Sequence, residues 1–213
     1  MANFFLWYDT EIPDQLLQNL REESENHAFD TSKVAEGGIN KSIRNSSVQW
    51  MSSDHWIAGF CMHYILKANR INFMYDIDGI EGEGLQYSKY HVGGHYSWHS
   101  DTSIEQYYTS QSKNNLDDSD PNCAFNSTRA NDLIAGHVER PRKLSFSLQL
   151  TDHNDYEGGN LQFQSEANLK IHNAPRKRGT IIIFDSRIRH RVTKVRSGRR
   201  DSLVGWVTGP RWR

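Results

Sequence analysis

Two segments in the first third of the chain repeat their apolar residues at the period of a helix. Residues 14–27 (DQLLQNLREESENH) place three leucines on one side and follow a proline, which predicts a short amphipathic helix. Residues 54–70 (DHWIAGFCMHYILKANR) carry a longer apolar stripe and start with Asp54, a residue type that caps helix N-termini. We expect both helices to support the core. The stripe of the second helix comprises Ile57, Phe60, Cys61, Tyr64, Ile65 and Ala68.

The spacing changes to the alternation of β-strands from about residue 85. Seven short runs rich in apolar and β-branched residues follow, separated by Gly, Asn, Asp or Pro, and they predict a strand-rich barrel or sandwich. Apolar and polar side chains alternate strictly in the run KLSFSLQL, so its polar side faces either the interior, where it would line a site, or solvent. The runs are 85–92, 143–150, 160–164, 168–172, 179–184, 190–195 and 202–208.

Residues 102–141 interrupt this strand-rich region with a segment that is rich in Ser, Asn, Asp and Gln and has little periodicity. Loops of this length are typically lids, binding loops or disordered segments. We therefore expect one structural domain overall. Residues 1–84 would form an N-terminal helical and strand support packed on the core, and residues 85–213 would form the core itself, with 102–141 as a lid-like insertion.

The composition is that of an ordinary globular protein. The chain has 213 residues, 36% of them hydrophobic and 11% aromatic, which suffices for one sizeable core. No apolar run reaches the length of about 18 residues that a membrane span needs, and acidic residues come too early at the N-terminus for a signal peptide. Cys61 and Cys123 lie far apart without CxxC spacing, which suits packing residues in a reducing compartment. We expect a cytoplasmic protein without a membrane partner.

The charge is distributed unevenly along the chain. Residues 176–213 carry 12 Lys and Arg against two Asp, a net charge of +10, and the overall charge of −1 therefore leaves −11 for residues 1–175. The basic C-terminal segment either attracts an anionic cosubstrate or partner, or is a set of solvated strand faces.

One short motif offers two ligands for a metal ion. His99 and Asp101 stand two residues apart, and on an extended chain both side chains project to the same side. Two histidines and one carboxylate on one face of an octahedron leave three open positions, which suits iron(II) that accepts a bidentate ligand and dioxygen together. Such a site needs a second histidine, and an HxD pair taken alone is more often a surface pair.

The C-terminal run 179–200 contains a candidate for the second histidine. It predicts a strand, a turn and a second strand that begins at His190. Arg200 follows ten residues later, where an arginine can reach beside the metal from the neighbouring strand and hold a carboxylate through two hydrogen bonds. Taken separately, His190 is equally well a half-buried strand histidine, and Arg200 is equally well one member of a basic face.

Together, the order and spacing of these features resemble the 2-oxoglutarate- and iron(II)-dependent dioxygenases. Within that superfamily the chain is most similar to the prolyl 4-hydroxylase and PKHD-type hydroxylase group, whose patterns Y-x-x-G-x-x-Y-x-x-H-x-D, YEGGxL and HxVxxVxxGxR match residues 90–101, 156–161 and 190–200. The resemblance covers about residues 40–210. It implies a mainly β fold with flanking helices and a double-stranded β-helix (jelly-roll) core. The arginine at position 200 points to the viral or bacterial branch, because animal and plant prolyl hydroxylases often carry lysine there.

Carried over position by position, the resemblance implies roles for eight residues. The implied iron(II) ligands are His99, Asp101 and His190. The implied cosubstrate and substrate contacts are Arg200 at the distal carboxylate of 2-oxoglutarate, Tyr90 and Ser145 near the cosubstrate, and Tyr96 and Trp206 on the substrate side. The implied reaction uses O2 and 2-oxoglutarate to hydroxylate an unactivated C–H bond, foremost in a peptidyl proline, and releases succinate and CO2. Ascorbate is a candidate reductant in this group.

Three other interpretations stay open. A β-helix that has lost turnover would bind a peptide or a sugar, although the intact set of ligands and arginine argues against it. A related oxygenase would act on a free amino acid or on nucleic acid, but a nucleic-acid demethylase is expected to carry a second arginine six residues after Arg200, where this chain has Trp206. A peptide or protein is therefore the expected partner. A zinc hydrolase on a similar barrel would have no need of Arg200.

Overall fold

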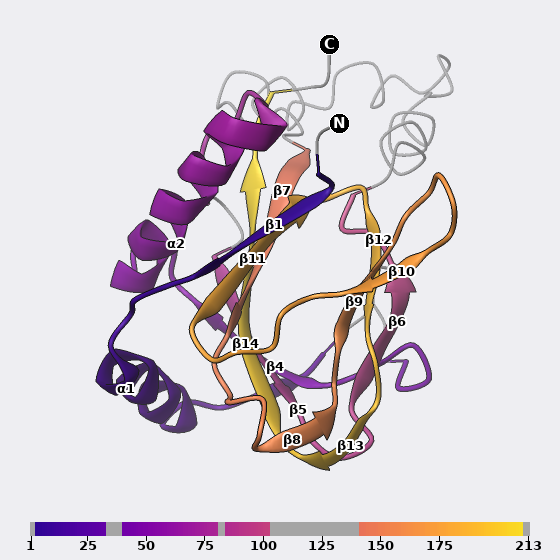
Figure 1. Ribbon diagram of the computed structural model, residues 1–213. Helices are drawn as coiled ribbons and strands as arrows, with labels where there is room; N and C mark the ends of the chain where they lie inside the picture. Colours follow the sequence, from indigo (N-terminus) through magenta and orange to yellow (C-terminus); the bar gives the residue numbers. More distant parts are fainter. Residues whose placement is uncertain (1–2, 33–39, 81–83, 103–140, 211–213) are drawn as a thin grey trace, which may run out of the picture.

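The computed structural model describes residues 3–32, 40–80, 84–102 and 141–210, and in it two antiparallel β-sheets face each other (Figure 1). The larger sheet contains, in spatial order, β1 (Phe5–Asp9), β11 (Thr180–Asp185), β7 (Arg142–Gln149), β14 (Arg200–Thr208), β5 (Leu85–Tyr90), β4 (Ser47–Met51) and β2 (Asp30–Thr31). The smaller sheet contains β10 (Ile171–Asn173), β9 (Leu161–Gln164), β12 (Arg189–Val192), β6 (His95–His99) and β3 (Arg44–Asn45). A separate ribbon pairs β8 (Tyr156–Gly158) with β13 (Val195–Gly198).

Both predicted helices are present and lie on the outer side of the larger sheet (Figure 1). Helix α1 spans Asp14–Glu25, and α2 spans Trp56–Ala68 and continues into a π-helical turn, η1 (Asn69–Phe73). The expectation that Asp54 caps α2 was wrong. His55 occupies the N-cap, and its Nδ1 accepts a 3.3 Å hydrogen bond from the Ile57 amide.

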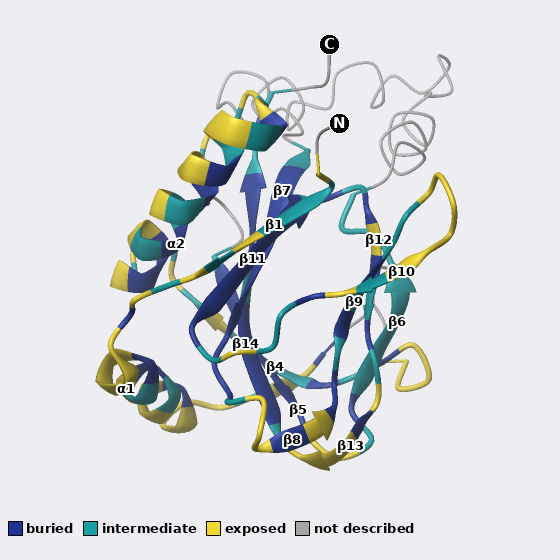
Figure 2. Ribbon diagram, in the orientation of Figure 1, coloured by how far each residue is buried: buried dark blue, intermediate teal, exposed yellow. Residues whose placement is uncertain are grey.

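The larger sheet separates two apolar clusters. On its outer side, residues of α1 and α2 pack against one face of the strands, and this cluster includes Leu17, Cys61, Leu148 and Leu203. Between the two sheets lies a smaller cluster that contains Phe163, Phe184 and Val192. Figure 2 shows buried residues along the central strands of the larger sheet. The fold is mainly β with flanking helices and a jelly-roll core, which confirms the fold class implied by the resemblance.

Strand β7 shows which way its polar side faces. Its apolar residues join the helix-side cluster, while Ser145, Ser147 and Gln149 on the opposite side are also buried. Those polar side chains therefore point into the space between the sheets and not to solvent. Strand β14 alternates in the same way, because Leu203 and Val207 belong to the helix side, whereas Arg200, Ser202 and Trp206 line an internal pocket.

Each of the seven predicted runs contains a strand, with ends that differ by a few residues. The run 190–195 is divided between β12 of the smaller sheet and the start of β13 in the separate ribbon, so the expectation of one strand there was wrong. Within residues 1–84, strands β1, β2 and β4 pair into the larger sheet and β3 into the smaller one. Nearly all of the expected lid-like insertion 102–141 lies outside the described residues. Within the described ranges, no helix combines the length and apolar character needed to cross a membrane.

Candidate metal centre and adjoining pocket

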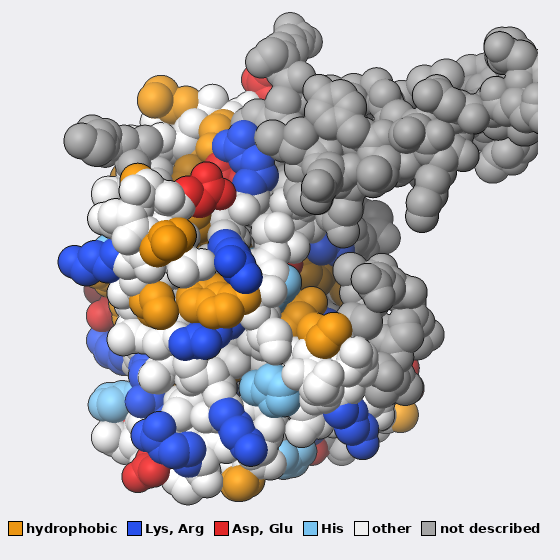
Figure 3. Space-filling model, turned by 90° about the vertical axis from the view of Figure 1, so that its right-hand side faces the viewer, with side chains coloured by type: hydrophobic (Ala, Val, Ile, Leu, Met, Phe, Trp, Pro, Cys, Tyr) orange, Lys and Arg blue, Asp and Glu red, His pale blue; other side chains and the backbone are white. Residues whose placement is uncertain are grey.

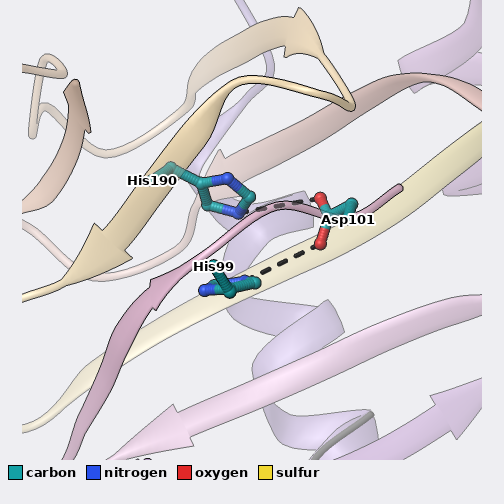
Figure 4. A group of neighbouring side chains, drawn as sticks. All are labelled: His99, Asp101 and His190. Atoms are coloured by element: carbon teal, nitrogen blue, oxygen red, sulfur yellow. Dashed lines mark ion pairs between the residues drawn. The ribbon is translucent and has the colours of Figure 1, made fainter. Parts of the chain in front are cut away.

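The structure brings His99, Asp101 and His190 together between the two sheets (Figure 4). His99 ends β6, Asp101 lies two residues further on, and His190 lies directly opposite His99 in the antiparallel pairing of β12 with β6. Each residue offers a ligand atom, and these atoms all lie within 4.8 Å of one another. Nε2 of His99 is 3.7 Å from Oδ1 of Asp101, and Nε2 of His190 is 3.7 Å from Oδ2. Spacing and donor types fit one small divalent cation.

Backbone carbonyls orient both imidazole rings toward this centre. Nδ1 of His99 lies 2.8 Å from the carbonyl oxygen of Ser97, and Nδ1 of His190 lies 3.0 Å from that of Ile188. A carbonyl oxygen only accepts hydrogen bonds, so Nδ1 carries the proton in each neutral ring. The Nε2 lone pair is then free to face the carboxylate, which is the tautomer that a metal ligand requires.

The surroundings shift the pKa values of His99 and Asp101. Burial, followed by the proximity of His190, lowers the pKa of His99 to about 3, so the imidazole is neutral. Burial by itself would raise the pKa of Asp101, but His190, His99 and a hydrogen bond from Ser145 together outweigh it and lower that pKa. A neutral imidazole at His99 and a carboxylate at Asp101 are the protonation states that metal ligands require.

Ser145, for which the resemblance predicts a contact with the cosubstrate, lies against Asp101 in the structure. Its hydroxyl donates a 2.7 Å hydrogen bond to Oδ2 of Asp101 and lies 2.9 Å from the hydroxyl of Ser186. Ser145 is fully buried and is not among the residues that line the pocket. The backbone carbonyl of Ser186 also accepts hydrogen bonds from the amides of Asp101 and Thr102, at 2.9 and 3.1 Å. Both serines therefore hold Asp101 in position.

A pocket of about 410 Å³ opens beside the three ligands and reaches Arg200. Arg200 is only 1% exposed, and it donates hydrogen bonds to Oε1 of Gln149 (3.0 Å) and Oγ of Ser202 (3.2 Å). Its Nε has no hydrogen-bond partner, and no carboxylate of the described residues forms an ion pair with it. A buried guanidinium without a counter-charge is costly unless a ligand supplies an anion.

The sequence placed Arg200 on a strand next to the metal-bearing strand, and this was wrong. Arg200 begins β14 of the larger sheet, whereas His190 lies on β12 of the smaller sheet, so the arginine faces the ligands across the sandwich. Tyr90 lies opposite Arg200 in the pairing of β14 with β5, and its ring centre is 5.5 Å from the guanidinium carbon. Tyr90 is thus adjacent to Arg200, as its expected role requires.

The two residues expected on the substrate side also line this pocket. Tyr96 stacks on His99 with ring centres 3.6 Å apart, and burial raises the pKa of its hydroxyl. The guanidinium of Arg142 lies 3.9 Å from the ring centre of Trp206, whose buried indole N–H has no hydrogen-bond partner within the described part of the chain. The half-exposed Trp50 lies 6.1 Å from Trp206, ring centre to ring centre.

Several pocket residues were missed at the level of sequence. Arg44 donates to Oε1 of Gln86 at 3.2 Å and lies 4.7 Å from the ring centre of Tyr96, but β3, which carries it, is too short to leave a periodic signal. Ser202, which lines the pocket, and Gln149, which contacts Arg200 from outside the pocket lining, were detectable in principle, since each occupies a polar position in an otherwise apolar alternation.

Comparison with known sequences identifies the superfamily. The model of the 2OG-Fe(II) oxygenase superfamily matches residues 85–208, which is more than half of the chain. A PKHD-type hydroxylase of Synechococcus sp. (strain CC9311) is 44% identical over 67 residues, covering 30% of this chain and 28% of that protein. Another from Crocosphaera subtropica is 34% identical over 89 residues, covering 41% and 39%. The chain thus matches well under half of the length of these curated relatives.

Solved structures support the same fold at low sequence identity. A Pseudomonas putida prolyl-4-hydroxylase has a TM-score of 0.63 at 16% identity, with 98% of this chain and 94% of that chain covered. A prolyl hydroxylase from Trichoplax adhaerens, in complex with a hypoxia inducible factor peptide fragment, has a TM-score of 0.68 at 14% identity, with 97% and 84% covered. With the clustered ligands and the facing arginine, the match over residues 85–208 shows that this chain belongs to the 2OG-Fe(II) oxygenase superfamily.

Proposed function

We propose that the chain is an iron(II)- and 2-oxoglutarate-dependent dioxygenase that hydroxylates an unactivated C–H bond of a peptide, with a prolyl residue as the first candidate. The single observation that carries this proposal is the buried guanidinium of Arg200, which has an unpartnered Nε in the same pocket as His99, Asp101 and His190. A zinc hydrolase or an inactive binding module has no use for a buried cation at this position.

The residues present fit iron(II). The three ligands offer two imidazole nitrogens and one carboxylate, and the adjoining pocket leaves room for further ligands on one side. This is the facial arrangement of two histidines and one carboxylate that non-haem iron(II) oxygenases use. When bound, iron(II), 2-oxoglutarate and O2 would supply the oxidising chemistry that converts C–H to C–OH, with succinate and CO2 as co-products.

The residues of the pocket would orient 2-oxoglutarate by charge and shape. Arg200 is held by neutral partners, Gln149 and Ser202, so its full positive charge is available to the distal carboxylate of the cosubstrate. Gln149 is itself anchored, since its amide donates to the carbonyl of Pro175 at 3.3 Å. An anchored arginine loses little conformational freedom on binding, which favours one orientation of the cosubstrate.

Aromatic side chains on the other side of the pocket support a peptidyl proline as substrate. Tyr96 and Trp206 line the same pocket as the metal ligands, and aromatic side chains in a pocket pack well against a saturated ring. The relatives that resemble this chain include proteins named as prolyl hydroxylases, one of them with a bound peptide fragment. The chain matches only a minor part of the length of the curated relatives, so we propose the prolyl substrate for this chain and do not take it from their names.

Anaerobic titration of the purified protein with iron(II) and then 2-oxoglutarate tests the cofactor chemistry. We expect a weak visible charge-transfer band, which requires the keto acid to chelate the iron. His190→Ala should abolish the band. Arg200→Gln should keep iron binding but weaken 2-oxoglutarate by about 30-fold or more, since it removes the buried partner of a carboxylate.

Two matched controls separate these effects from general damage. His95→Ala removes a neighbouring histidine of β6 that bonds to backbone carbonyls and not to Asp101, and Arg191→Gln removes an arginine from the outer face of β12. Both should retain the band and the affinity for 2-oxoglutarate. Absence of any band in the wild-type protein, with neither iron nor 2-oxoglutarate bound, would refute the proposal.

We also propose that the protein is located in the cytoplasm and that ascorbate serves as its reductant. Cys61 is a buried free thiol in the apolar cluster under α2, which suits a reducing compartment. Stimulation of turnover by ascorbate, compared with another reductant such as dithiothreitol, tests the second point.

A further inference from the structure

The outer face of the smaller sheet has an unusual charge pattern. The five strands of this sheet, β3, β6, β9, β10 and β12, contain no Asp or Glu. Their inward side chains build the apolar cluster and the metal centre. Figure 3 views the molecule from this side and shows Lys and Arg side chains around hydrophobic and neutral polar ones, with few acidic side chains. The outward residues, deduced from the strand pairing and from the contact of Trp98 with Arg191, include Asn45, His95, Trp98, Gln162, Gln164, Ile171, Asn173, Arg189 and Arg191.

Arg189 and Arg191 are oriented by neutral groups. Nε of Arg191 donates to Oε1 of Gln162 at 2.8 Å, and NH1 of Arg189 donates to Oε1 of Gln164 at 3.4 Å. Both guanidinium carbons lie near the ring of Trp98, at 4.5 Å for Arg191 and 5.9 Å for Arg189. Neither arginine forms an ion pair with a carboxylate of the described residues. Both guanidinium groups are therefore held in a defined orientation, and no carboxylate of the described residues neutralises their positive charge.

Other arginines of the same basic segment behave differently. Arg187 pairs with Asp185 at 2.6 Å, Arg199 pairs with Asp201 at 2.8 Å, and Arg196 lies 3.8 Å from Glu157. Ion pairs outside this face therefore neutralise part of the positive charge of residues 176–213. On this face, no carboxylate of the described residues pairs with Arg189 or Arg191. Glu166 lies in the turn between β9 and β10 and is accompanied there by Lys170.

We propose that this face binds an extended acidic segment of a partner protein. Arg189 and Arg191 stand two residues apart on one strand, and alternate residues of a strand are about 6.5–7 Å apart. An extended peptide with acidic residues at every second position has the same repeat, so two carboxylates can meet two guanidinium groups in register. The amides of Gln162, Gln164 and Asn173 provide neutral hydrogen-bonding groups beside them. Nothing in this proposal depends on catalysis in the pocket.

Fluorescence anisotropy with labelled octapeptides tests the proposal on the full chain at low ionic strength. The probes are a peptide that alternates Glu with Ser, a peptide of equal composition with its four Glu in one block, and an alternating Gln and Ser peptide. We expect the alternating acidic peptide to bind most tightly and the Gln peptide not to bind. The double variant Arg189→Gln/Arg191→Gln should weaken binding by about tenfold, since two charge-assisted pairs are lost.

Arg196→Gln is the matched control. It makes a charge change of the same kind on β13, outside the smaller sheet, and should leave binding within about twofold of wild type. Thermal unfolding of each variant confirms that the fold is kept. Equal weakening of binding by Arg196→Gln and by the double variant would overturn the proposal, as would the absence of binding by any acidic peptide. It would also be overturned if the block peptide bound as tightly as the alternating acidic peptide. Tighter binding of an oligouridylate of equal charge would show that the face prefers nucleic acid, and would overturn the proposal too.

Discussion

Ser145 donates a 2.7 Å hydrogen bond to Oδ2 of Asp101 and so links the larger sheet to the end of β6 in the smaller one. Ser186, on the turn after β11, adds a second connection, because its hydroxyl contacts Ser145 and its carbonyl accepts from the Asp101 amide. The carboxylate is thereby held from both its backbone and its side chain. Groups that orient a metal ligand in this way commonly tune metal affinity as strongly as geometry at the ligand itself.

Replacement of Ser145 by Ala is therefore expected to weaken metal binding by about 10- to 100-fold. Anaerobic calorimetric titration with Co(II), as a redox-stable substitute for iron(II), measures the affinity. Ser145→Thr keeps the hydroxyl and should keep most of the affinity. Ser147→Ala is the control, since Ser147 lies on the same polar side of β7 and lines the pocket. Equal affinities for Ser145→Ala and wild type would rule out this role for Ser145.

Trp206 contains a buried indole N–H that has no hydrogen-bond partner among the described residues. Trp206→Phe removes this donor and keeps a ring, so the free energy of unfolding should change by less than about 1 kcal/mol or increase. Trp206→Ala removes the ring as well and should lower the free energy of unfolding by about 3–5 kcal/mol. Urea unfolding of both variants checks this. A similar loss in both would mean that the N–H is bonded in solution.

Gly198 ends β13 and has a φ of 72°, a left-handed conformation that favours glycine. A Cβ at this position would overlap the backbone carbonyl of Asp155. Gly198→Ala should therefore lower the free energy of unfolding by about 1–3 kcal/mol or more. Gly59→Ala is the control, because a Cβ on this exposed face of α2 meets nothing within 4 Å and alanine favours the helix by about 0.5–1 kcal/mol. Opposite signs for the two variants are the expected result.

Asp185 should make stability depend on pH in the acid range. Burial by itself would raise its pKa, but hydrogen bonds from Arg187 and Tyr75 outweigh this effect and lower the pKa below the ordinary value of 3.8. A carboxylate with a lowered pKa stabilises the fold above pH 3.8, and this stabilisation is lost as the pH falls through the value in the folded protein. The difference in unfolding free energy between wild type and Asp185→Asn should be largest near neutral pH and shrink below pH 3.8. A difference that is constant with pH would contradict it.

Local patterns were sufficient to predict most of the elements. The helical stripe around Cys61 and the alternation in β7 and β14 depend on side-chain periods that are set by backbone geometry alone. The family motif placed His99, Asp101 and His190 in one sequence pattern, and the structure brings their ligand atoms within 4.8 Å. The caps and strand ends were predicted less well, because they depend on single hydrogen bonds such as that of His55.

Short-range periodicity and side-chain chemistry were enough to predict the kinds of elements, the polar and apolar faces of β7, and the residue types available to a metal. The three-dimensional pairing of the strands was needed to show which face of β7 lies inward, that Arg200 approaches from the sheet opposite His190, and that Ser145 holds Asp101. Side chains along a strand alternate with the same period of two whichever face of the strand is buried. Contacts between residues far apart in the chain decide which strands pair. Those long-range pairings, and not any local signal, position the buried arginine where an anion can neutralise it.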